Sequence, residues 1–139
     1  MSNVQSVQEI YAAFGRGDGA AVLERLAPDV AWEAWDRHSA QDAGVPWLAA
    51  RHDREGVGEF LAIVGAWETR RFEVLDLLAS ERQVVAEVAV EWRLPSGAEL
   101  SDEEVHLWTF DESGAVTRFR HYVDTAKHMQ AAGIAAAVA

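Results

Sequence analysis

The strongest constraint on the fold is a period-two pattern near the C-terminal end of the chain. Apolar and polar residues alternate over 99–110 and 115–123, and the intervening Asp-Glu-Ser-Gly is typical of a hairpin turn. The pattern predicts two antiparallel strands with one buried face. His106 and His121 fall among the residues of that face. Since imidazole is costly to bury without a partner, the hairpin raises the question of what these histidines contact.

The same periodicity test divides the rest of the chain into helical and extended segments. Apolar residues at helical spacing predict helices over 3–15, 19–26 and 54–67. Alternation predicts further strands over 29–35, 71–79 and 83–94. No period is evident over 36–53, which we expect to be a long loop, and Asp124 is a candidate cap for a C-terminal helical tail.

The order of these elements predicts the fold class. Helices precede a run of four strands in antiparallel succession, which is typical of an α+β fold with helices segregated on one sheet. The chain has no internal repeat or linker-like segment, so we expect residues 1–139 to form a single domain.

Composition excludes several kinds of partner. The net charge of −11 repels phosphate backbones, so we expect no nucleic-acid partner. The start of the chain does not resemble a signal peptide and no apolar run reaches membrane-spanning length, so we expect a cytoplasmic protein without a membrane partner. Six tryptophans in 139 residues favour a cavity with aromatic walls.

Four stretches carry a resemblance to a known superfamily: VQEIYAAFGRGDGAAVLERLAPDVAWE, REGVGEFL, QVVAEVAVEW and VHLWTFDESGAVTRFRHYVD. Their order resembles the ketosteroid isomerase-like, or nuclear transport factor two-like, superfamily, and most closely its SnoaL-like members. The resemblance implies a curved antiparallel sheet wrapped around helices, forming a cone with one deep apolar pocket. It also implies a homodimer through the outer face of the sheet. Members include isomerases, cyclases, hydratases, epoxide hydrolases and non-catalytic carriers.

The resemblance can be carried over position by position. The isomerase tyrosine falls on Ile10, beside Tyr11, and the isomerase base falls on Ala34. The oxyanion donor falls on His106. The Asp–His pair of the SnoaL-like cyclases could correspond to Asp124 with His106 or His121, whereas the Asp–Arg–Asp arrangement of the epoxide hydrolases has no convincing copy.

The candidate catalytic residues are therefore His106, His121 and Asp124. Two plainer explanations remain open, because a wall histidine can be structural and Asp124 can act only as a helix cap. We also expect His106 to matter more than His121, with one of its ring nitrogens held by Tyr11 or a backbone group. Candidate substrate-binding residues, for which core filling is the alternative, are Tyr11, Phe14, Trp32, Trp47, Phe60, Val64, Trp92, Trp108 and Phe119.

Other polar residues have plainer interpretations. Alternation turns Glu33 outward, and it also turns Arg118 and Arg120 outward, where Glu87 or Glu91 could pair with them. His38 and His52 are expected on the surface of the long loop, and His128 on an exposed tail. The five histidines lack a familiar metal-binding spacing, so we expect no metal and no cofactor.

Two functions follow from these expectations. The first is an enzyme that performs acid–base catalysis on a small apolar oxygenated molecule, as an isomerase, cyclase or epoxide hydrolase. The second is a protein of the same fold that binds a hydrophobic ligand without chemistry. Histidine side chains in an apolar pocket favour the enzyme, because imidazole exchanges protons near neutral pH.

Overall fold

The computed structural model describes residues 1–134, and the remainder of the predicted domain, 135–139, lies outside the described residues. The helices are α1 (Asn3–Gly15), α2 (Gly19–Glu24), α3 (Ser39–Asp42), the 3₁₀ turn η1 (Pro46–Leu48), α4 (Arg54–Gly65) and α5 (Thr125–Ala131). The strands are β1 (Leu26–Trp32), β2 (Glu68–Ala79), β3 (Gln83–Arg93), β4 (Glu99–Phe110) and β5 (Val116–Tyr122). The α+β class predicted from the sequence is confirmed.

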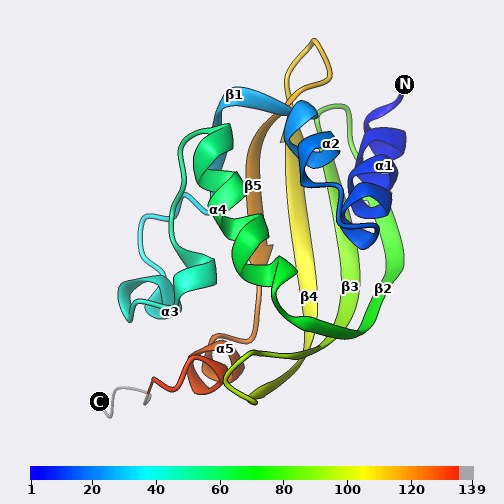
Figure 1. The fold of residues 1–139 in the computed structure, drawn as a ribbon. Helices are drawn as coiled ribbons and strands as arrows, with labels where there is room; N and C mark the ends of the chain where they lie inside the picture. The colour runs from blue at the N-terminus through cyan, green and yellow to red at the C-terminus, as the bar shows by residue number, and fades with distance from the viewer. Residues whose placement is uncertain (135–139) are drawn as a thin grey trace.

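One five-stranded sheet organises the fold, in the order β1-β5-β4-β3-β2. Strands β2 to β5 pair antiparallel, as predicted, but β1 pairs parallel to β5, so the sheet is mixed rather than purely antiparallel. Helices α1, α2 and α4 cover one face of the sheet (Figure 1). No helix within residues 1–134 is long and apolar enough to cross a membrane.

The helices cover the sheet because each presents an apolar stripe to it. Val7 and Ile10 of α1, and Val57 and Val64 of α4, are buried. Asp53 caps the first turn of α4, since its carboxylate accepts a hydrogen bond from the Gly56 N–H at 2.7 Å. Between these helices and the sheet lie the residues that form the site.

Four segments differ from the sequence prediction, one of them β2, which begins at Glu68 rather than at residue 71. The second helix ends at Glu24, and β1 occupies Leu26–Trp32 rather than 29–35. The strand stops at Trp32 because Glu33 has a left-handed backbone with φ 58°, which breaks the pleat. The loop predicted over 36–53 contains α3 and η1, which are too short to produce a recognisable apolar period.

The hairpin of β4 and β5 has the predicted turn and register. Gly114 adopts φ 87° in that turn, and the Asp111 carboxylate accepts backbone N–H groups from the same turn. His106 lies directly opposite His121 in the ladder, as Trp108 lies opposite Phe119. All four side chains are buried on the helix-facing side, as predicted.

Candidate functional site

A pocket lies between the helices and the sheet, with an interior volume of about 80 Å³. All nine side chains predicted to contact a ligand line this pocket, as do His106 and His121. Their role in binding a substrate stays a prediction. Nine further lining residues were not predicted, and four of them are aromatic or charged: Trp67, Phe72, Glu104 and His128.

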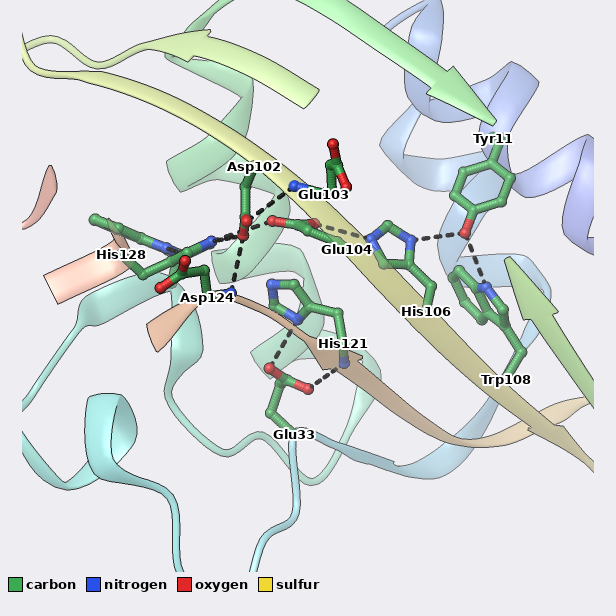
Figure 2. A network of polar contacts seen from close by, with 11 residues as sticks. Tyr11, Glu33, Asp102, Glu103, Glu104, His106, Trp108, His121, Asp124 and His128 are labelled. Carbon is green, nitrogen blue, oxygen red and sulfur yellow. Dashed lines mark hydrogen bonds and ion pairs between the residues drawn. The ribbon is translucent and has the colours of Figure 1, made fainter. Parts of the chain in front are cut away.

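His106 is held at both ring nitrogens (Figure 2). Its Nδ1 lies 2.7 Å from the Tyr11 hydroxyl, and its Nε2 lies 3.1 Å from Oε1 of Glu104. The indole N–H of Trp108 donates to the Tyr11 oxygen at 3.1 Å, so the hydroxyl hydrogen is free to donate to His106. This pattern assigns a neutral His106 with its proton on Nε2, which donates to Glu104.

The protonation states of this group agree with that assignment. Burial lowers the pKa of His106, and the opposing effect of Glu104 does not reverse it. Burial raises the pKa of Glu104, but hydrogen bonds from His106 and His128 outweigh it and hold the pKa well below its ordinary value. Burial raises the pKa of Tyr11, so its hydroxyl stays protonated. Glu104 is therefore an anion on the pocket wall.

His121 forms a separate ion pair with Glu33. Its Nδ1 lies 2.8 Å from Oε2 of Glu33, and the other carboxylate oxygen accepts the backbone N–H of His121 at 2.8 Å. Burial lowers the pKa of His121, but the Glu33 carboxylate outweighs this effect and raises it to about 9. His121 is thus an imidazolium at neutral pH. Its Nε2 has no hydrogen-bond partner among residues 1–134, and the ring lines the pocket.

His128, on α5, connects the pocket to a second carboxylate. Its Nε2 lies 2.9 Å from Oδ2 of Asp102 and 3.1 Å from Oε2 of Glu104. Its Nδ1 accepts the indole N–H of Trp47 at 2.9 Å. Burial lowers the pKa of His128, and the two carboxylates outweigh burial and raise it. The Trp47 contact decides the protonation state, because an indole can only donate and Nδ1 must therefore be unprotonated.

Asp102, Glu104 and His128 offer ligand atoms within 4.8 Å of one another, a spacing that a metal ion could bridge. The contact with Trp47 does not fit that use. A metal bound to Nε2 would leave the imidazole proton on Nδ1, facing the indole N–H. We therefore assign these residues to hydrogen bonding rather than to a metal site.

The family model described as SnoaL-like domain matches residues 7–119, which is most of the chain. The chain belongs to the SnoaL-like family. The resemblance drawn from the sequence is confirmed.

Solved structures agree with this SnoaL-like assignment. A protein of this fold and unknown function from Burkholderia pseudomallei is 29% identical, with a TM-score of 0.78, covering 94% of this chain and 97% of that one. A putative polyketide cyclase from Xanthomonas campestris is 21% identical, with a TM-score of 0.70, covering 94% and 96%. The Δ5-3-ketosteroid isomerase of a Mycobacterium species is 19% identical, with a TM-score of 0.68, covering 88% and 93%. No curated protein sequence matches the chain.

Asp124 of this SnoaL-like domain does not lie beside the pocket histidines, as the proposed catalytic pairing would require. It is exposed, caps α5 by accepting the Lys127 N–H at 3.3 Å, and does not line the pocket. Its backbone N–H donates to Asp102 at 3.2 Å. The carboxylates that contact histidines in this domain are Glu33, Asp102 and Glu104.

Two interpretations of single residues were wrong. Glu33 is fully buried rather than outward, because its left-handed backbone turns two successive side chains, Trp32 and Glu33, inward. His128 is only 2% exposed, because α5 packs against β4. His52 is exposed, as expected, and His38 caps α3 at the surface by accepting the Gln41 N–H.

Arg120 of β5 also has other partners than those predicted. Arg120 donates to the carbonyl of Ala34 and lies 4.3 Å from the centre of the Trp35 ring. Glu91 approaches Arg71 at 3.9 Å instead. Strand order explains the difference, because β4 separates β5 from β3 in the sheet.

The alternation of β4 contained a signal for the missed carboxylates. If His106 and Trp108 face the pocket, the same period of two places Glu104 and Asp102 on that face as well. The structure confirms this arrangement. Glu33 and His128 had no comparable signal.

Proposed function

We propose that this protein is an acid–base enzyme that moves a proton next to the carbonyl group of a small, largely apolar substrate, as an isomerase or cyclase. The observation that carries the proposal is the free Nε2–H of the His121 imidazolium in an aromatic pocket that also contains the Glu104 carboxylate. A hydrogen-bond donor and a carboxylate on the wall of one pocket can act together in this chemistry, and the lowered pKa of Glu104 makes it a weaker base than an ordinary glutamate.

The proposed roles follow from which atoms are free. His121 donates a hydrogen bond to the substrate carbonyl oxygen and stabilises the negative charge that develops there. Each oxygen of Glu104 accepts one hydrogen bond from a histidine, which leaves lone pairs for the substrate. Glu104 takes a proton from the adjacent carbon and returns it to another carbon of the resulting enolate.

His106 has an indirect role in this scheme. Both of its nitrogens are engaged, by Tyr11 and Glu104, so it has no proton to offer a substrate without breaking a contact. We therefore assign His106 to holding Glu104 in place, and His121 to the contact with the substrate oxygen. This assignment reverses the order of importance expected from the sequence.

Epoxide hydrolysis is less well supported. No arginine lines the pocket of the described chain. The buried Arg51 is instead occupied by the carbonyl of Gly56 and by Glu59, both at 2.9 Å. An Asp–Arg–Asp arrangement therefore has no counterpart on the pocket wall.

Proton transfer can be tested before the substrate is known. We expect the protein to catalyse uptake of deuterium from D₂O at the carbon beside the carbonyl of small cyclic and aryl ketones, followed by NMR. Glu104→Gln should remove this activity, since an amide is not a base at neutral pH. Ketones that bind without deuterium uptake in the parent protein would instead support a non-catalytic carrier.

We also propose that the SnoaL-like domain forms a homodimer through the outer face of the sheet. Leu78, Val85 and Leu107 lie side by side on neighbouring strands of that face, and Leu78 is 56% exposed. Exposed apolar groups next to one another favour association. Together with the family resemblance, this patch supports a symmetric contact.

Leu78→Asp tests the dimer. We expect light scattering to give a dimer mass for the parent protein and a monomer mass for the variant, because the new charge would be buried at the contact. Circular dichroism should be unchanged, since residue 78 contributes little to the core. A monomeric parent protein at micromolar concentration would contradict the proposal.

A further inference from the structure

Helix α5 inserts a buried histidine between two carboxylates of β4. His128 is 2% exposed, and Figure 2 shows its ring pointing at Asp102 and Glu104. Its single Nε2–H is shared between Oδ2 of Asp102 at 2.9 Å and Oε2 of Glu104 at 3.1 Å. Asp102 and Glu104 lie on the same face of β4, so their oxygens are close enough to repel each other.

The two carboxylates are not equally supported by other donors. Asp102 accepts two backbone N–H groups, from Glu103 at 2.9 Å and Asp124 at 3.2 Å. Glu104 has only the Nε2–H of His106 besides His128. If the donor between them is removed, Glu104 loses one of its two hydrogen bonds while Asp102 stays beside it, so Glu104 should bind a proton more readily.

Trp47 fixes which nitrogen of His128 carries the proton. The indole N–H donates to Nδ1 at 2.9 Å, so the proton of a neutral imidazole must be on Nε2, where the carboxylates are. Trp47 of η1 thus directs the Nε2–H of His128, on α5, toward the carboxylates of β4.

We propose that His128 is a positioning residue for Glu104. Its ring is oriented by Trp47, and its Nε2–H keeps the Glu104 carboxylate ionised and facing the pocket. The inference rests on the proposed function, in which Glu104 is the base. His128 does not itself reach the substrate in this scheme, because both of its nitrogens are engaged.

Other charged or titratable groups also face Glu104. His106 donates to it from β4, and the His121 imidazolium of β5 adds favourable charge. Tyr11 of α1 is neutral, and Glu33 is already paired with His121. None of these groups lies between Asp102 and Glu104, so none replaces the N–H of His128.

Glutamine and leucine at position 128 separate positioning from packing. In His128→Gln the amide can accept from Trp47 and donate to the carboxylates, whereas His128→Leu fills the space without a donor. The carboxyl ¹³C signal of Glu104 can be assigned by its loss in Glu104→Gln. We expect this signal to be that of an anion at pH 7 in the parent protein and in His128→Gln. In folded His128→Leu it should titrate at a pKa above the ordinary glutamate value of about 4.3.

The parent protein gives a test that does not depend on a variant folding. Its ¹⁵N signals should show His128 protonated on Nε2 and unprotonated on Nδ1; a proton on Nδ1 would overturn the proposal. So would an ionised Glu104 at acidic pH in a folded His128→Leu variant. These readouts need no substrate, so they can fail while deuterium uptake succeeds, or succeed while it fails.

Discussion

Replacing Glu33 with glutamine is expected to destabilise the protein by about 3 kcal/mol at pH 6 and by almost nothing above pH 9.5. The reason is the buried ion pair between Glu33 and His121, whose atoms lie 2.8 Å apart with the carboxylate fully buried. Burial lowers the pKa of His121, but Glu33 raises it from 6.5 to about 9. A glutamine at position 33 removes the charge that holds the proton on His121.

The sign of the pH dependence follows from the raised pKa. The folded state binds the His121 proton more tightly than the unfolded state, so the pair contributes its full stability below about pH 6.5. That contribution falls as the pH rises and is lost above the folded-state pKa of about 9. The difference between parent and variant should therefore shrink steadily over this range.

Urea unfolding at several pH values between 6 and about 9.5 measures this difference. Glu103→Gln is the matched control, because it makes the same substitution at an exposed position of β4. The control should follow the parent protein at each pH. A constant difference between Glu33→Gln and the parent across the range would contradict a charge-based effect and indicate lost packing instead.

The largest expected effects on activity are those of Glu104→Gln and His121→Gln. Once a ketone that exchanges deuterium has been found, each variant should lower the exchange rate by about 10²–10⁴-fold, the usual contribution of a positioned acid or base. Glu104→Gln removes the proposed base. His121→Gln removes the cationic donor and leaves Glu33 buried without its partner, so its stability must be measured alongside its activity.

His106→Gln should have a smaller effect than either variant. An amide can keep one of the contacts that His106 makes with Tyr11 and Glu104. His52→Gln, at an exposed position outside the pocket, is the matched control and should exchange deuterium at the parent rate. A loss of activity in His106→Gln that exceeds the loss in His121→Gln would reverse our assignment of the two histidines.

The hairpin of β4 and β5 illustrates what a sequence pattern can predict. Its alternation and its turn residues together determined the register, so the facing of His106, Trp108, Phe119 and His121 was predicted correctly. The two carboxylates on the same face of β4 were predictable by the same rule. Acidic residues are usually placed at the surface, and only the partner histidines make their burial tolerable.

Glu33 and His128 could not be placed in the same way. The side chain of Glu33 turns inward because of one left-handed residue at the end of β1, and glutamate carries no local preference for that conformation. His128 is buried by the packing of α5 on β4, a contact between elements that a local pattern does not contain. Both depend on tertiary structure.

The parallel pairing of β1 with β5 has a consequence for the order of folding. Leu26 pairs with Val116, and Trp32 with Phe119, so this contact closes a loop of most of the chain and is entropically the most costly pairing in the sheet. Glu33 can contact His121 only after β1 has paired with β5. An intermediate that contains the β2–β3–β4 meander without β1 and β5 would have an incomplete acid–base site. The raised pKa of His121 should therefore appear late in refolding and serve as a marker of the completed native topology.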